Sequence, residues 1–163
     1  MNQLALAAAY FVLGRASLLL AIPPGFAAPV WPASGLALAA LLLGGNRMWP
    51  GVLLGHFLVN LSTGGTDVVS VVLSVVIAGG GTLQALAGAR LVRGFSGYPN
   101  SLARGKDIIR FMLLAGPAAC LISPTVGTLA LAALGKISAA EFPFSWATWW
   151  VGDVLGVLLV TPA

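Results

Sequence analysis

The sequence predicts an all-α integral membrane protein, a polytopic bundle of about six transmembrane helices that forms one domain, residues 1–163. Apolar residues make up 59% of the chain, charged residues only 7%, and the mean hydropathy is +1.00. So little polar surface does not cover a water-soluble globule. Long uninterrupted apolar runs recur along the chain, whereas the alternating pattern of a transmembrane β-barrel is absent. The lipid bilayer is therefore the expected partner of most of the surface.

The first two apolar runs cover residues 4–22 and 31–43. The first is long enough to cross a hydrocarbon core of about 30 Å. Its only basic residue, Arg15, lies inside the run rather than before it, which favours a retained helix over a secretory signal peptide. Pro23-Pro24-Gly25 is expected to end this helix. Trp31-Pro32 then begins the second helix, with proline in the first turn, where its missing N–H costs nothing.

The third run, residues 49–61, also begins with a tryptophan and a proline, Trp49-Pro50. At about fourteen residues, the second and third runs are short for a full crossing, so a re-entrant hairpin is the alternative to two complete spans. The fourth run, residues 68–92, contains Gly79-Gly80-Gly81. For these glycines, close packing against a neighbouring helix is favoured over a break in the helix.

A polar stretch, residues 93–107, precedes the fifth run, residues 108–134. Pro117 and Pro124 are expected to kink this run, because each removes a backbone hydrogen bond and crowds the preceding turn. The sixth run covers residues 145–160. Six crossings place both termini on the same side of the membrane.

The basic residues indicate which side that is. The second and fourth loops and their flanks contain Arg47, Arg90, Arg93, Arg104, Lys106 and Arg110. The loops on the opposite side contain only Lys136. Because Lys and Arg accumulate in cytoplasmic loops, both termini are predicted to be cytoplasmic. The same residues explain the net charge of +4, so we expect no nucleic-acid partner.

Asp153 lies within the last apolar run, where a carboxylate costs about 2.5–3.5 kcal/mol on insertion scales and needs a partner. Gly152 and Gly156 leave one side of this helix bare for the backbone of a neighbouring helix. Counted from the outer ends of their runs at about 1.5 Å per residue, Arg15, His56 and Asp153 lie at similar depth. The sequence thus predicts a pair between Arg15 and Asp153, with His56 nearby.

This polar group has two interpretations, a ligand or ion site and an architectural pair that ties the first helix to the last. The candidate ligand-binding residues are Arg15, His56, Asp153, Trp31, Trp149 and Trp150. The alternative for His56 is a hydrogen-bonded packing residue, and the alternative for the tryptophans is a belt at the membrane interface. Asn60 and Gln84 are expected to form structural hydrogen bonds between helices.

No catalytic constellation is found in the sequence. It contains one histidine, no carboxylates paired within a helical turn, and no nucleophile or phosphate-binding motif. The single cysteine, Cys120, excludes an internal disulfide and offers no metal-ligand spacing. We therefore expect neither an enzyme nor a bound cofactor or metal.

Three stretches of the chain form a pattern of their own. They are Pro29-Val30-Trp31-Pro32-Ala33-Ser34-Gly35-Leu36-Ala37-Leu38-Ala39-Ala40, then Trp49-Pro50-Gly51 with Gly55 and Asn60, and finally Trp149-Trp150-Val151-Gly152-Asp153-Val154-Leu155-Gly156 with Thr161-Pro162. This pattern resembles the MASE1 family of bacterial membrane-associated sensor domains, over nearly the whole chain. The Val-Trp-Pro-x-Ser-Gly and Trp-Trp-x-Gly-Asp-x-x-Gly elements are its most specific parts.

The resemblance implies an all-helical sensory domain in the bacterial inner membrane, which passes a periplasmic or intramembrane signal to a cytoplasmic output. In such proteins the output is usually a histidine kinase of a two-component system or a diguanylate cyclase of cyclic di-GMP signalling. Family members generally continue into further helices and a soluble domain, so this chain is expected to be a truncated member or a stand-alone relative. The resemblance does not supply the ligand.

Two other classes of protein stay open. Broken, glycine-rich helices and buried charges also suit the substrate-binding subunit of a transporter. An accessory subunit of a larger membrane complex is the third class, and it would have other membrane subunits as partners.

Overall fold

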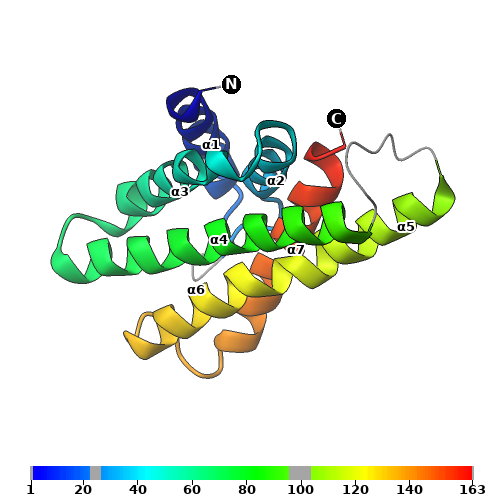
Figure 1. The fold of residues 1–163 in the computed structure, drawn as a ribbon. Helices are drawn as coiled ribbons and strands as arrows, with labels where there is room; N and C mark the ends of the chain where they lie inside the picture. Colours follow the sequence, from blue (N-terminus) through cyan, green and yellow to red (C-terminus); the bar gives the residue numbers. More distant parts are fainter. Residues whose placement is uncertain (1, 23–26, 96–103, 163) are drawn as a thin grey trace.

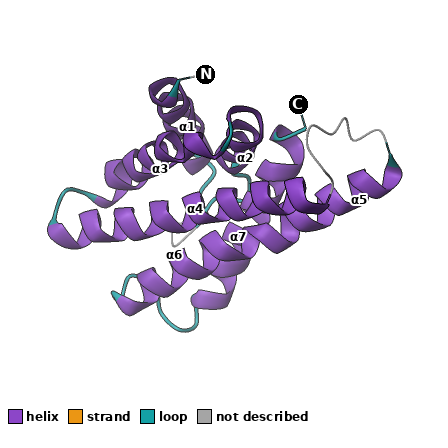
Figure 2. Ribbon diagram, in the orientation of Figure 1, coloured by secondary structure: helices purple, strands orange, loops and turns teal. Residues whose placement is uncertain are grey.

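The computed structural model describes residues 2–22, 27–95 and 104–162, and nearly all of these residues are helical (Figure 2). Within these ranges there is no strand, and Ile22 and Ala27 form an isolated bridge. The helices are α1 (Gln3–Leu18), α2 (Pro32–Gly44), α3 (Trp49–Gly64), α4 (Val68–Phe95), α5 (Gly105–Leu113), α6 (Ile122–Ala133) and α7 (Phe142–Val160). The predicted all-α fold is confirmed.

α5 and α6 form one long rod, because a π-helical turn, Leu114–Ala118, and a 3₁₀ turn, Ala119–Leu121, join them without a loop. With this rod counted once, the described part of the chain has six helical rods, which pack against one another at different angles (Figure 1). α4, the rod Gly105–Ala133 and α7 are long and apolar enough to cross a membrane. α1 and α2 are apolar but shorter. The number of rods agrees with the six apolar runs.

The ends of α1 follow local hydrogen bonding rather than the limits of the apolar run. The side chain of Asn2 accepts a backbone N–H hydrogen bond 2.7 Å long and caps the first turn. The helix ends at Leu18 rather than at the predicted Ile22. The predicted break at Pro23-Pro24-Gly25 lies outside the described residues, as does part of the polar stretch between α4 and α5.

α2 and α3 each have a proline in their first turn, as predicted. α3 continues to Gly64, past the predicted end at Leu61. The hydroxyl groups of Ser62 and Thr63 donate to carbonyl oxygens of the same helix instead of ending it. The helix stops at Gly65, whose φ of 96° is a left-handed conformation that glycine adopts readily.

The three consecutive glycines do not interrupt α4, which is continuous. A Cβ on Gly80 would lie 2.9 Å from the side chain of Val126 in α6. A Cβ on Gly81 would lie 2.2 Å from the imidazole ring of His56 in α3. The favoured interpretation, close packing against neighbouring helices, is therefore confirmed.

The two prolines of the fifth run act differently. Pro117 lies inside the π-helical turn, where the helix is irregular, as expected for a proline within a membrane helix. Pro124 lies in the first turn of α6, a position at which proline interrupts no hydrogen bond of that helix. The irregular stretch Leu114–Leu121 ends just before Pro124, and a kink caused by Pro124 itself stays a prediction.

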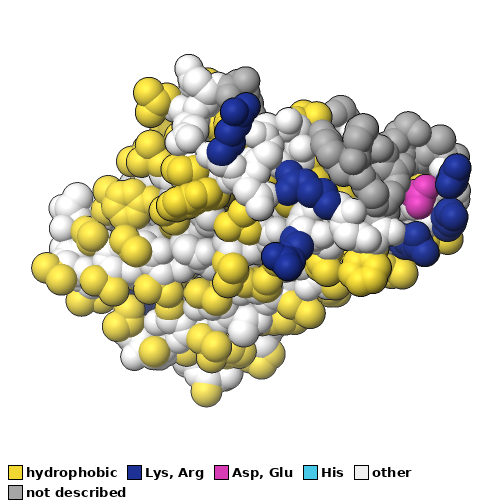
Figure 3. Space-filling view, viewed as in Figure 1, with side chains coloured by type: hydrophobic (Ala, Val, Ile, Leu, Met, Phe, Trp, Pro, Cys, Tyr) yellow, Lys and Arg dark blue, Asp and Glu magenta, His cyan; other side chains and the backbone are white. Residues whose placement is uncertain are grey.

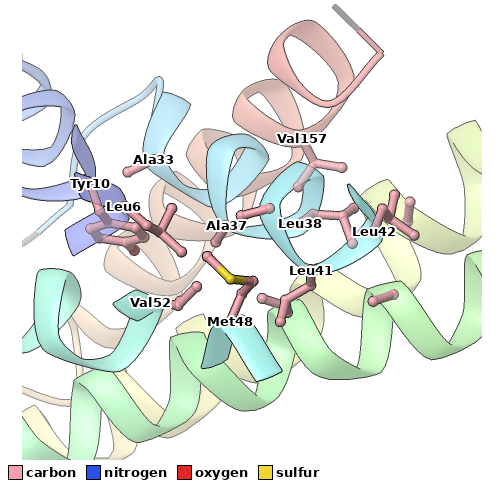
Figure 4. Close-up of a cluster of buried hydrophobic side chains, with 14 of the residues drawn as sticks. Leu6, Tyr10, Ala33, Ala37, Leu38, Leu41, Leu42, Met48, Val52 and Val157 are labelled. Carbon is pink, nitrogen blue, oxygen red and sulfur yellow. The ribbon is translucent and has the colours of Figure 1, made fainter. Parts of the chain in front are cut away.

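The main apolar core lies where α1, α2, α3 and α4 meet, and Val157 of α7 adds to it (Figure 4). Leu6 of α1, Leu41 of α2 and Val52 of α3 are completely buried there. Many other large apolar side chains are exposed, including Leu19 and Val68. In a water-soluble protein such exposure would be unfavourable, whereas in a bilayer these side chains face lipid.

The Lys and Arg side chains on the visible face gather near both chain termini and α5, whereas the opposite end of that face is hydrophobic or uncharged (Figure 3). Of the residues behind the orientation prediction, Arg47 follows α2, and Arg90 and Arg93 lie near the end of α4. We call the basic end the inner end of the bundle and the opposite end the outer end.

Candidate functional site

The two most specific sequence elements pack directly against each other, because α2 crosses α7 at backbone contact distance. The backbone N–H of Trp31 donates to the carbonyl oxygen of Gly152 over 2.9 Å. A Cβ on Gly35 would lie 2.1 Å from the carbonyl oxygen of Gly156, so neither helix tolerates a side chain there. The prediction that one side of the last helix is bare for a neighbour's backbone is confirmed, and α2 is that neighbour.

Two hydroxyl groups form hydrogen bonds where α2 crosses α7. Ser34 Oγ donates to the carbonyl oxygens of Trp31 and Asp153, at 2.8 and 3.0 Å. Near the inner end, Thr161 Oγ1 donates to the carbonyl oxygen of Gly35 over 3.1 Å. The motif serines, threonines and glycines therefore lock α2 to α7 on both sides of Asp153.

Asp153 is buried, with 2% of its surface exposed, and its partner is a neutral amide. Gln84 Nε2 in α4 donates to Asp153 Oδ2 over 2.9 Å. Gln84 Oε1 accepts the backbone N–H of Ser123, also at 2.9 Å, in the first turn of α6. Because that turn follows the break in the rod, its N–H lacks a regular helical partner. One glutamine side chain thus joins α4, α6 and α7, which confirms its predicted role between helices.

The predicted pair between Arg15 and Asp153 is wrong. Arg15 is exposed, and its Nη1 donates to Ser62 Oγ in α3 over 3.3 Å. Depth along the helix was estimated from the sequence, but the direction in which each side chain points was not. α1 packs mainly on α3, so Arg15 meets that helix and remains at the surface.

His56 is buried close to Asp153, as predicted, and both residues line the same small cavity. Its ring packs against Tyr10 and Trp31, with ring centroids 5.2 and 6.4 Å away. The ring fits against α4 because Gly81 has no side chain. His56 Nδ1 has no hydrogen-bond partner although it is buried. An unpaired buried nitrogen is unusual and calls for a partner such as a water molecule.

A pocket of about 150 Å³, which we call the outer pocket, opens at the outer end of the bundle. It lies between the end of α3, the first half of α4, the segment before α2, and parts of α6 and α7. Trp31, His56, Asn60 and Trp149 are among its lining residues. None of the described residues that line it is Asp, Glu, Lys or Arg.

Trp150 and Asn60 do not take the predicted positions. Trp150 Nε1 donates to the carbonyl oxygen of Pro117, so this side chain faces the break in the α5–α6 rod instead of the outer pocket. Asn60 Nδ2 donates to the carbonyl oxygen of His56 in its own helix, over 2.9 Å. The predicted interhelical bond of Asn60 is therefore not formed, although the residue does line the pocket.

Three residues near the site escaped prediction from the sequence. Ser34 belongs to the first motif, so its position beside two glycines was an available signal. Ser123 precedes Pro124, which hints at a helix start with unpaired N–H groups. The hydroxyl of Tyr10 accepts the indole N–H of Trp31. Nothing in the sequence around Tyr10 distinguishes it from the other residues of the first apolar run.

Fold and site together define a polytopic membrane protein with a buried polar centre beneath a pocket at one end of its bundle. The MASE1 family model matches residues 2–163, so the chain belongs to the MASE1 family. MASE1 domains are membrane-associated sensor domains, which gives this chain a membrane sensory input role. No match is found among curated proteins or among solved structures.

Proposed function

We propose that this chain receives its signal in the outer pocket and passes it through α7 to a cytoplasmic output, such as a histidine kinase or a diguanylate cyclase. In this proposal the bundle lies in a bacterial inner membrane with both termini in the cytoplasm. The observation that carries the proposal is that both motif helices border the pocket, α2 through Trp31 and α7 through Trp149.

α7 is suited to carry a change from one end of the bundle to the other. It runs from Phe142 near the outer end to Val160, which is followed by Thr161 bonded to α2. Trp149 and Asp153 are four residues apart and share one face of this helix. A ligand that shifts Trp149 therefore acts on the helix that is locked to α2 and to Gln84.

The size and lining of the pocket restrict the ligand. A cavity of about 150 Å³ is the size that accommodates one benzene molecule. Because the described lining offers no charged side chain, an ionised ligand would lose its hydration without gaining a counter-ion. We infer a small uncharged ligand, about as large as one aromatic ring, that stacks on the tryptophans.

Thermal unfolding of the purified chain in lipid nanodiscs tests this inference, with phenol and benzoate as probes of equal ring size. Phenol is expected to raise the melting temperature in a saturable way, since a ligand at 100 times its Kd adds about 2.7 kcal/mol. Benzoate is expected to have no effect, because its carboxylate meets no counter-charge.

A pair of neighbouring variants separates pocket binding from partition into lipid. Leu73→Trp fills the pocket, whereas Val72→Trp places the same ring on an exposed side chain of the same helix. Only Leu73→Trp should abolish the effect of phenol. Equal responses in both variants, or an equal effect of benzoate, would refute the proposed pocket. Stoichiometric co-purification with other membrane subunits would instead favour the accessory-subunit interpretation.

A further inference from the structure

A second cavity lies deeper in the bundle, next to Asp153, and we call it the inner cavity. Its volume is about 10 Å³, close to the smallest space that holds one water molecule. Its polar lining comes from Tyr10, Ser34, His56, Gln84, Ser123 and Asp153. A site of this size with several polar partners is one that water occupies in proteins.

His56 borders both cavities, since it is among the lining residues of each. Its Nδ1 faces Gly81, a residue that lines the inner cavity but not the outer pocket. This nitrogen is the unpaired one, and the ring is 3% exposed. The imidazole therefore has one edge toward the inner cavity and borders the outer pocket as well.

In the described part of the chain, only three side chains that can titrate face Asp153 across the inner cavity. α1 supplies Tyr10, α3 supplies His56, and the turn before α6 supplies Cys120. α2, α4 and α6 supply only Ser34, Gln84 and Ser123, which do not titrate. No Lys or Arg is among the described residues that line the inner cavity. Asp153 thus has hydrogen-bond donors but no counter-ion.

We propose that the inner cavity is a proton-binding site, in which one water molecule bridges His56 Nδ1 and the carboxyl group of Asp153. In the neutral Nδ1–H tautomer, a proton from the outer pocket binds Nε2, and the resulting imidazolium passes its Nδ1 proton to the bridging water. The water gives a proton to the carboxylate of Asp153, and the imidazole is left neutral as the Nε2–H tautomer. The net change is that one external proton converts the carboxylate into a carboxylic acid.

This proton site goes beyond the proposed ligand-binding function, because it uses a separate cavity. Protonation would remove the charge at the α4, α6 and α7 junction and weaken the bond that Gln84 donates to Asp153. The module would then respond to the acidity of the outer compartment as well as to a ligand.

Infrared spectroscopy of the full chain in lipid nanodiscs tests the proposal. The carboxylic C=O band of Asp153 is assigned by its loss in Asp153→Asn, in a chain that has only four acidic side chains in all. We expect this band to grow reversibly as the external pH falls and to shift after transfer to D₂O. A band whose intensity does not change with external pH would overturn the proposal.

The role of His56 is tested with His56→Gln, which keeps a hydrogen-bonding side chain but carries no proton through a ring. The rate at which the Asp153 band shifts after transfer to D₂O, which reports hydrogen–deuterium exchange at this carboxyl group, should fall by about tenfold or more. Val72→Leu, which changes an exposed side chain that lines neither cavity, should leave the rate unchanged. An unchanged rate in His56→Gln would contradict the relay.

A measurement on the unmodified chain keeps the proposal testable if His56→Gln does not fold. The chain has a single histidine, so ¹⁵N-histidine labelling gives the NMR signals of one imidazole. Nδ1 is expected to be hydrogen-bonded, and its shift should respond to Asp153→Asn. A free Nδ1 that does not respond would overturn the proposal.

Stabilisation by phenol is measured separately in the Asp153→Asn variant. Failure of the proton site is therefore distinguishable from failure of ligand binding in the outer pocket.

Discussion

At the scale of single residues, the centre of the molecule is Asp153 and the amide that holds it. A carboxyl group inside a membrane bundle needs hydrogen bonds, and Gln84 supplies one while its own oxygen is satisfied by Ser123. Gln84 therefore satisfies two buried groups at once. Ser34 fixes the backbone of Asp153 from the opposite side.

Replacement of Gln84 should be costly because it leaves both buried groups unpaired. We expect Gln84→Met, which preserves the length of the side chain, to destabilise the protein by about 2–6 kcal/mol, since each of the two unpaired groups costs ~1–3 kcal/mol. Unfolding in detergent, followed by tryptophan fluorescence, measures this change. Asn60→Leu loses a bond inside one helix and should cost less than about 1.5 kcal/mol. Similar losses in both variants would mean that Gln84 is not the junction described.

The sequence identified Asp153, His56 and Gln84 as important because polar residues within apolar runs are few. It paired Asp153 with the wrong partner, since charge suggested Arg15 whereas the packing supplied an amide. Which helix lies beside which, and which way each side chain points, depends on contacts between residues distant in sequence. No local pattern encodes those contacts.

At the scale of helices, glycines decide how closely neighbours approach. Gly35 and Gly156 bring α2 and α7 into backbone contact, and Gly81 makes room for His56. The sequence predicted close packing at the glycines of α4 and α7 correctly, because small residues are the usual means of contact between membrane helices. It did not reveal that the glycines of the two motifs meet each other.

The glycines of α4 offer a matched comparison. A Cβ at Gly81 would lie 2.2 Å from the ring of His56, whereas nothing lies within 4 Å of a Cβ at Gly79. Gly81→Ala should therefore destabilise the protein by about 1–3 kcal/mol through overpacking. Gly79→Ala should stabilise it by about 0.5–1 kcal/mol, because alanine favours the helix. Thermal unfolding of both variants checks this, and equal shifts would contradict the packing of His56 on α4.

The stability of the first turn of α4 should depend on pH through the carboxyl group of Asp67. Its carboxylate accepts hydrogen bonds from the hydroxyl of Ser70 and, at 3.1 Å, from the backbone N–H of Ser70, and these bonds hold the pKa of Asp67 below its ordinary value of 3.8. A carboxylate with a lowered pKa stabilises the fold above its ordinary pKa, and this contribution is lost as the pH falls through the lowered value. Amide hydrogen exchange in the first turn of α4 should accelerate there, after correction for intrinsic rates. The Asp67→Asn variant should lack this pH dependence. If exchange in the variant still depended on pH in the same way, Asp67 would be excluded as the cause.

At the scale of the whole molecule, the bundle has a basic inner end (Figure 3), an uncharged outer pocket and a buried acid. Composition predicted the membrane class, because so apolar a chain cannot cover a water-soluble surface, and the uninterrupted apolar runs predicted the helical fold. The motifs predicted the family. The pocket was not predicted as a volume, because it arises where segments far apart in the sequence leave space between them.

The most direct test of the account is labelling of single cysteines in intact cells with a small membrane-impermeant thiol reagent. Asn60→Cys lines the outer pocket, whereas Ala85→Cys lines the inner cavity behind His56, and the native Cys120 is completely buried. We predict rapid labelling of Asn60→Cys from outside the cell and none of Ala85→Cys. Labelling of Asn60→Cys only after the membrane is permeabilised, or equal labelling of both, would contradict an outward-facing pocket above a sealed acid.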